Sequence, residues 1–253
     1  MEDRKRIIKG YLECDGSIVR ISSLEDIMNF VSKYGKAISE MSEKDLDELT
    51  KRNSNSKEYI TDDCNIIYME NPLILQVGTC IENYKIKDGT IAIADEAFKL
   101  SDWSRNASLK IRNILIPDSV VAIGQSSFVN KQNLIGINFP KALMRIGDQA
   151  FAGCHLVDSI LFPDSLKYIG GHAFQFTHIK RLSLPTTVKK IGSFAFADCS
   201  ELESIEFKGV PEIIGSEILS NCSALKEIII PQGTTDYFEK ELFPISKELF
   251  IEK

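Results

Sequence analysis

The chain has 253 residues, of which 43% are hydrophobic and 26% charged, a composition that excludes disordered, collagen-like and membrane-bundle proteins. The 30 Lys and Arg residues against 36 Asp and Glu residues give a formal net charge of −6, which is unfavourable for binding nucleic acid. No segment approaches the roughly 18 consecutive apolar residues of a membrane span, so we expect none.

The charged amino terminus does not run into the roughly 7 to 15 apolar residues of a secretory signal. We therefore expect a cytoplasmic protein, or a secreted or surface protein if a leader precedes Met1. The six cysteines include no Cys-x-x-Cys pair. A chain of this length needs no disulfides to hold its core, which favours free thiols in a reducing compartment.

Residues 1–58 are predicted to form an N-terminal helical segment. Ser23 precedes apolar residues at helical spacing, and a second predicted helix runs from Ser42 to Lys51. Three short runs of β-branched and aromatic residues come after it, at positions 59–60, 66–68 and 73–75. We interpret these runs as a small hairpin that covers the open apolar end of the region beyond residue 80.

A hexapeptide that begins with Ile and usually ends in Ala-Phe then recurs along the chain. Its copies are Ile93–Phe98, Ile123–Phe128, Ile146–Phe151, Ile169–Phe174, Ile191–Phe196 and Ile214–Leu219. Their last positions are 30, 23, 23, 22 and 23 residues apart, and the long interval contains an insertion near residues 101–108. Each copy is followed by an apolar-x-x-apolar-x-apolar block that usually ends in Pro.

The alternation of apolar and other residues in each block predicts a short strand with one buried face. A unit of about 23 residues cannot bury that face alone, so the units stack and their Ile, Leu and Phe columns form one continuous core. Pro closes each strand because it cannot donate a ladder hydrogen bond. The recurring Gly marks a bend where the backbones approach closely or turn tightly.

This repeat resembles the unit of the BspA-type, or Treponema pallidum-type, leucine-rich repeat family over residues 81–251. The resemblance implies a β-rich (α+β) fold, a solenoid of about seven stacked coils with an N-terminal helical and hairpin cap, and a solenoid domain over 59–253. Members of the family are commonly bacterial surface or secreted proteins tied to adhesion. The resemblance therefore implies a binding role.

The sequence contains no phosphate-binding loop, nucleophile elbow or zinc helix, so we expect no enzyme activity and no cofactor. Asp148, His172 and Ser193 fall in neighbouring columns, but they stand where any polar residue would fit. Cys154, Cys199 and Cys222 recur at one position of the repeat. Only the last two are on adjacent coils, so we predict buried thiols and no metal site.

The outward positions of the predicted strands form a ribbon of small polar and exposed apolar residues, which suits a protein contact. The candidate protein-binding residues are Asn113, Leu115, Asn138, Ser159, Leu161, Arg181, Ser183, Glu206, Glu227 and Ile229. A plain solvated face is the other interpretation of this ribbon. Basic residues of the middle coils also precede an acidic coil, a pattern that could orient a partner or only confer solubility.

The sequence thus predicts a non-enzymatic protein–protein interaction module with a protein partner of unknown identity. Nucleic acid is not an expected partner, because the basic residues lack interleaved exposed aromatics. The alternative is a carbohydrate-binding protein or an enzyme that uses the 101–108 insertion. This insertion holds Trp103, the only tryptophan of the chain.

Overall fold

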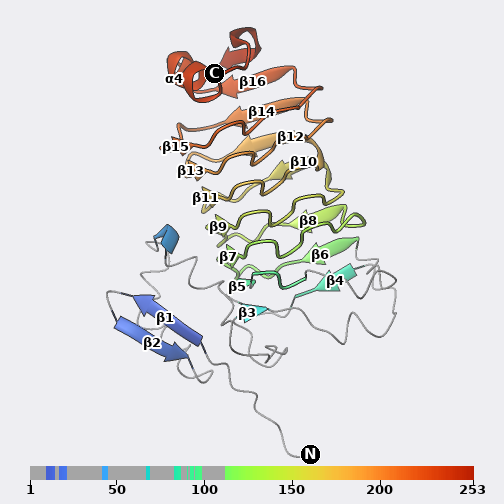
Figure 1. Ribbon diagram of the computed structural model, residues 1–253, viewed down its shortest axis with the longest axis vertical. Coiled ribbons are helices and arrows are strands. Elements are labelled where there is room, and N and C mark those ends of the chain that lie inside the picture. The colour runs from blue at the N-terminus through green and yellow to red at the C-terminus, as the bar shows by residue number, and fades with distance from the viewer. Residues whose placement is uncertain are drawn as a thin grey trace, which may run out of the picture.

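The computed structural model is a stack of parallel β-coils that rises from β3 and β4 to the C-terminus (Figure 1). It describes residues 10–14, 17–21, 42–44, 67–68, 83–86, 90, 92–93, 95–98 and 112–253. Within the stack, every strand pair is parallel, and the partners come from successive coils. The predicted repeat solenoid is therefore confirmed.

One face of the stack is a seven-stranded sheet of two-residue strands. These strands are β3 (Ile67–Tyr68), β5 (Ala92–Ile93), β7 (Ala122–Ile123), β9 (Arg145–Ile146), β11 (Tyr168–Ile169), β13 (Lys190–Ile191) and β15 (Ile213–Ile214). The six strands from β5 to β15 contain the first residue of each predicted hexapeptide. The Ile at that position is buried in all six described copies from Ile93 to Ile214.

The opposite face holds longer strands, which form two sheets (Figure 1). The first sheet contains β4 (Asn83–Lys85), β6 (Asn113–Leu115) and β8 (Gly136–Asn138). The second contains β10 (Val157–Leu161), β12 (His178–Leu184), β14 (Ser204–Phe207), β16 (Glu227–Ile230) and β17 (Phe250–Glu252). Each coil thus supplies one strand to each face, and the core lies between them.

A column of phenylalanine rings runs through that core. Neighbouring rings from Phe98 to Phe196 are stacked, with centroids 4.8 to 5.6 Å apart and interplanar angles of 7 to 18°. The rings of Phe139 and Phe162 pack edge-on against this column. Because the 23-residue period puts one ring above the next, the Phe position of the repeat is structural.

The C-terminal end is closed by a short helix, α4 (Thr235–Glu241), followed by the 3-10 turn η3 (Lys247–Leu249) and β17. The helix was not predicted. The departure from the repeat at this point explains the helix. Phe238 stands 23 residues after Gly215, at the position where the preceding coils have glycine. The helix turns Phe238 into the core, where its ring lies 4.8 Å from that of Phe207.

The N-terminal part differs from the prediction in two respects. Residues 10–21 form an antiparallel hairpin of β1 (Gly10–Cys14) and β2 (Ser17–Ile21), which the prediction of an N-terminal helical segment over 1–58 did not include. The strand predicted at 66–68 is present as β3, but it pairs in parallel with β5 as a rung of the stack. Of the helix predicted from Ser42, the described Glu43 and Lys44 are helical. The helix predicted after Ser23 and the strands at 59–60 and 73–75 lie outside the described residues.

Candidate functional site

The outward strand residues form two columns along the longer strands. In one column Ser159 lies beside Arg181, which lies beside Ser204, and Glu227 follows. In the other column the successive residues are Leu161, Ser183, Glu206, Ile229 and Ile251. Seven of the ten candidate residues are thus in register on one sheet. We call the outward face of this sheet, together with that of the three-stranded sheet β4–β6–β8, the strand ribbon.

The other three candidates lie on the three-stranded sheet. Asn113 pairs with Asn83 and Gly136, while Leu115 pairs with Lys85 and Asn138. In this part of the ribbon the amide of Asn138 is already used. Its Nδ2 donates to the carbonyl oxygen of Ile116 and its Oδ1 accepts from the Ile116 amide, both at 2.9 Å. Asn138 therefore holds two coils together, and its amide is not free to bind a partner.

Exposed aliphatic side chains interrupt the polar residues of the ribbon. Leu161 is 77% exposed, Leu115 50% and Ile251 40%, whereas Ile229 is half-buried. Ile251 was not among the predicted candidates, although the apolar-x pattern of Phe250 to Glu252 is its sequence signal. Protein interfaces bury aliphatic groups of this kind, so these positions suit a protein contact.

The polar residues between these aliphatic groups are partly paired. Ser183 Oγ donates a hydrogen bond of 2.6 Å to Glu206 Oε2. Beside the ribbon, Lys226 Nζ donates to Glu203 Oε1 at 2.9 Å, and this hydrogen bond lowers the pKa of the Glu203 carboxyl. Arg181 is exposed. The ribbon thus combines an exposed cation and one short hydrogen-bonded pair with isolated aliphatic groups.

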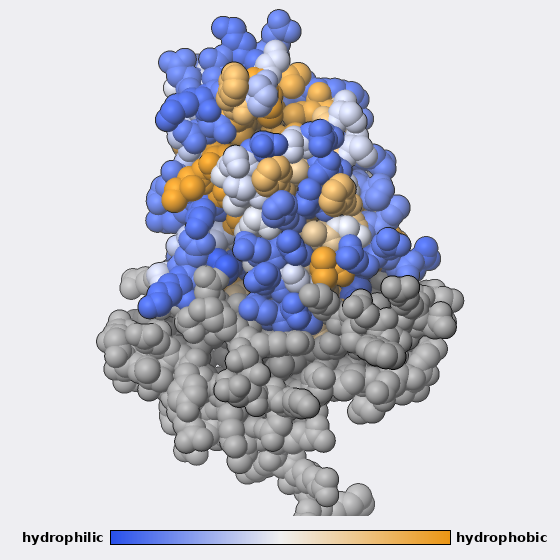
Figure 2. Space-filling model, viewed as in Figure 1, coloured by the Kyte–Doolittle hydropathy of each residue, from blue (hydrophilic) through white to orange (hydrophobic). Residues whose placement is uncertain are grey.

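Charges elsewhere on the coils mostly neutralise each other between neighbours. Lys189 lies 3.1 Å from Glu212, and Lys180 lies 4.0 Å from Glu201. These contacts join the basic middle coils to the acidic coil that follows them. They favour the interpretation of the charge pattern as solubility and coil pairing. On the side seen in Figure 2, hydrophobic groups adjoin one another towards the C-terminal end, and elsewhere they are scattered among hydrophilic ones.

The polar residues of the repeat turns do not form a catalytic set. A ring nitrogen of His172 lies 2.7 Å from Gln175 Oε1, and Asp148 Oδ1 accepts from the Gly171 amide. Ser193 Oγ lies 3.2 Å from Ser216 Oγ, so all three side chains are engaged with other groups. In the described part of the chain, no three His, Cys, Asp or Glu side chains gather as metal ligands would.

Burial was predicted for all three cysteines of the column. Cys154 and Cys199 are buried, whereas Cys222 is half-buried. Each thiol donates to the carbonyl oxygen of a Phe in the preceding coil. The bonded pairs are Cys154 with Phe128, Cys199 with Phe174 and Cys222 with Phe196. Burial raises the pKa of the Cys154 and Cys222 thiols to about 12. These thiols are therefore structural hydrogen-bond donors.

Trp103, the candidate of the alternative carbohydrate-binding or enzyme function, lies outside the described residues.

The pattern of 23-residue coils with an inward Ile, Ala and Phe also identifies the family. The model of the BspA type leucine-rich repeat region matches residues 121–249 in six copies, which is about half of the 253 residues. The chain belongs to the BspA-type leucine-rich repeat family. Six copies are fewer than the seven coils predicted from 81–251, and they lie in the part where the repeat is most regular. A comparison with curated protein sequences gives no match.

Solved structures similar to this BspA-type chain include three bacterial proteins. A leucine-rich repeat protein from Bacteroides ovatus is 32% identical with a TM-score of 0.47, over 56% of this chain and 37% of that one. The pneumococcal vaccine antigen PcpA is 18% identical with a TM-score of 0.51, and the match covers 68% of this chain and 41% of PcpA. The T. pallidum leucine-rich repeat protein TpLRR is 20% identical with a TM-score of 0.48, and the match covers 77% of this chain and 97% of TpLRR.

The likeness to PcpA shows the fold. The matched region spans less than half the length of the first two relatives. Among the described residues, no helix has the length and apolar character that crossing a membrane requires.

Proposed function

We propose that this BspA-type chain is a non-enzymatic interaction module that binds another protein through the strand ribbon. The observation that supports this proposal most directly is the exposure of Leu161 in a parallel sheet whose outward face is not covered by any described element. Family membership supports the same role, since repeat solenoids present extended surfaces to partners. One relative by fold, PcpA, is a pneumococcal vaccine antigen, and its likeness supports the fold of this module.

The chemistry of the ribbon favours a protein surface as its partner. Leu161, Ile229 and Ile251 offer apolar contacts, and Arg181 and Glu227 offer charges of opposite sign. A phosphate backbone would need a stripe of cations instead. The pairing of Ser183 with Glu206 fixes the centre of the surface. Such fixed polar groups next to aliphatic anchors lower the entropy lost on binding.

The proposal is tested by capture of partners on immobilised protein from extracts of the source cells and of cells that they contact. The double variant Leu161→Glu and Ile229→Glu places two carboxylates among the apolar contacts of the ribbon. We expect it to lose at least tenfold in the amount of any specifically retained protein, because buried unpaired charge opposes association. Circular dichroism checks that the solenoid is intact.

The matched control is Phe243→Glu, since Phe243 is 79% exposed on the C-terminal cap and lies outside the ribbon. This variant should retain partners as the wild type does. Equal loss in the ribbon and cap variants, or no protein retained by the wild type, would contradict the proposal.

A further inference from the structure

One coil departs from the repeat where it enters the longer sheet. Strand β12 begins four residues after Phe174, whereas β10 begins six residues after Phe151. The ladder between the two strands compensates with a register shift beside Asp158 and Ser159. His178 follows His155 by the 23 residues of the repeat, so the two side chains occupy one column, and their rings stack with centroids 4.0 Å apart. A pocket lies at this corner of the stack.

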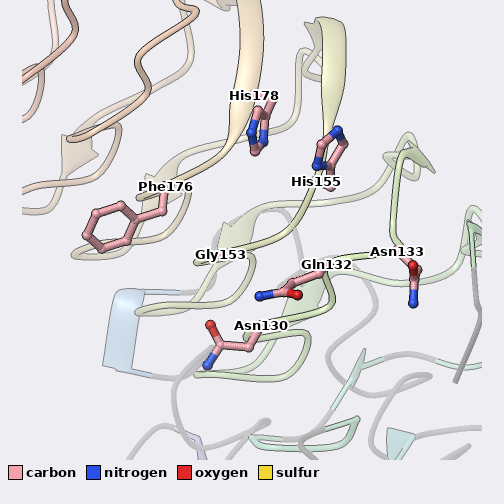
Figure 3. Close-up of a pocket in the computed structure, with 7 residues that line it drawn as sticks. All are labelled: Asn130, Gln132, Asn133, Gly153, His155, Phe176 and His178. Atoms are coloured by element: carbon pink, nitrogen blue, oxygen red, sulfur yellow. The ribbon is translucent and has the colours of Figure 1, made fainter. Parts of the chain in front are cut away.

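The pocket has a volume of about 510 Å³, which is within the range of small-ligand sites. Three successive coils line it. The first supplies Asn130, Gln132 and Asn133, the second His155, and the third Phe176 and His178. Figure 3 shows the two imidazoles side by side, the amides of Asn130 and Gln132 below them, and Phe176 at the border of the pocket.

Phe176 is an unusual residue for its position. Its φ of +60° is left-handed, a conformation that a bulky side chain rarely adopts. The equivalent residues of the other coils, two positions after each Phe, are Asn130, Gly153, Asp198 and Asn221, which tolerate positive φ. The ring is nevertheless 57% exposed, so burial does not compensate for this conformation. Strain without a packing gain is typical of functional positions.

The polar lining is made of groups that both donate and accept hydrogen bonds. Within the described part of the chain, the side chains of Asn130, Gln132 and Asn133 make no hydrogen bond. The Nδ1 atom of His178 is buried and also makes no hydrogen bond there. No residue of the lining is Asp, Glu, Lys or Arg. The pocket therefore offers several amide and imidazole groups, but no carboxylate, ammonium or guanidinium group that would select a charged ligand.

We propose that this pocket binds a neutral saccharide unit, with Phe176 as the platform for its apolar ring face. Saccharide hydroxyls donate and accept, and therefore match carboxamides and imidazoles. The C–H groups of a pyranose face pack on an exposed aromatic ring. This site is independent of protein binding by the strand ribbon and involves none of its candidate residues.

The test uses saturation-transfer NMR with irradiation of the aromatic protons of the full chain. The probes are methyl glycosides of neutral hexoses and N-acetylhexosamines and short neutral oligosaccharides. We expect transfer to the ring protons of at least one probe. In Phe176→Asn and in Gln132→Ala the affinity for that probe should fall at least tenfold.

Phe176→Asn separates binding from folding, because Asn occupies the same position as Asn130 and Asn221 in other coils. We expect the melting temperature to stay the same or to rise while the saccharide signal is lost. Phe243→Ala, a change of an exposed ring on the cap, should leave the signal unchanged. The ribbon variant Leu161→Glu should also keep it, so that failure of the ribbon and of the pocket can be told apart.

Two results would overturn the proposal. One is the absence of saturation transfer to every saccharide of the panel. If Zn²⁺ then binds the wild type and His155→Asn abolishes that binding, the pocket holds a cation and no saccharide. The other is binding of equal affinity in the wild type and Phe176→Asn.

Discussion

At the scale of single residues, the stack depends on positions where a side chain has no room. A Cβ at Gly147, Gly170, Gly192 or Gly215 would lie 2.5 to 2.7 Å from a backbone carbonyl carbon of the preceding coil. The prediction of close backbone approach at this column is thus confirmed. Two adjacent glycines of one coil, Gly170 and Gly171, separate this requirement from the general flexibility of glycine, because only a Cβ at Gly170 would overlap the backbone of the coil before it.

The first prediction compares Gly170→Ala with Gly171→Ala. The new methyl group at 170 would lie 2.5 Å from the carbonyl carbon of Gly147, whereas that at 171 meets its nearest atom at 3.3 Å. We expect Gly170→Ala to lower the free energy of unfolding by about 2–3 kcal/mol and Gly171→Ala to change it by less than about 1 kcal/mol. Urea denaturation measures both. Equal effects would mean that backbone approach does not limit this column.

The thiol column shows how one position can serve through different residues. Thr177 occupies the cysteine position in its coil, and its Oγ1 donates to the carbonyl oxygen of Phe174 at 2.8 Å. Cys154 Sγ donates to that of Phe128 at 3.0 Å. From this position the hydroxyl donates to a Phe carbonyl of its own coil and the thiol to a Phe carbonyl of the preceding coil, and only the thiol can lose its proton in the alkaline range.

The second prediction is that Cys154→Ser reduces the loss of stability at alkaline pH. The thiol pKa rises from 9.0 to about 12 in the folded state because of burial. Between these values the unfolded chain releases the proton and the folded chain keeps it, so stability falls with pH by up to about 1.4 kcal/mol per unit. The serine variant should lack this contribution. Urea midpoints at pH 8 and 10.5 measure it, and parallel pH profiles for the two proteins would contradict it.

At the scale of elements, the strands were predictable and the exceptions were not. The inward Ile205 and Phe207 of β14 follow the period of two that the repeat block shows. In the sequence, the early start of β12 is indicated only by the single 22-residue interval between Phe174 and Phe196. One missing residue does not reveal where the strand begins, because the ladder can absorb it at any point along the turn or strand.

Of the two candidate sites, the strand ribbon could be predicted from the sequence and the pocket could not. The columns of the strand ribbon follow from the repeat alone, since every coil places equivalent residues at equivalent points. The pocket could not be found this way, because Gln132, His155 and His178 occupy one column as a mixture of residue types. Its character depends on the left-handed conformation of Phe176 and on the stacked imidazoles, which are properties of the three-dimensional coil.

The third prediction concerns the cap element α4. Phe238 is fully buried and lies against Phe207, so Phe238→Ala leaves a cavity at the open end of the stack. We expect a loss of about 3–4 kcal/mol in the free energy of unfolding and faster hydrogen exchange in β16 and β17. Phe243→Ala, on the same cap but 79% exposed, is the control and should change stability little. A small effect at Phe238 would mean that α4 does not close the core.

At the scale of the whole molecule, each coil contacts mainly its neighbours, so contacts that reach across several coils have a distinct role. Glu43 makes such a contact. Its carboxylate accepts from Lys190 Nζ at 2.9 Å and lies 3.4 Å from Arg145 Nη1. These two cations belong to β13 and β9, with β11 between them. The contact therefore joins Glu43 to two coils that are separated by a third.

The fourth prediction is an energetic coupling between Glu43 and Lys190, measured by a double-mutant cycle of Glu43→Gln and Lys190→Met. Both side chains are more than a third exposed, so the coupling should be about 0.5–1 kcal/mol in 0.1 M salt. It should approach zero in 1 M NaCl because the pair is screened. The control pair Lys226 and Glu203 has the same 2.9 Å separation, but Lys226 is 70% exposed. It should couple more weakly. If Glu43 and Lys190 showed no coupling at low salt, this ion pair would not tie the N-terminal segment to the stack.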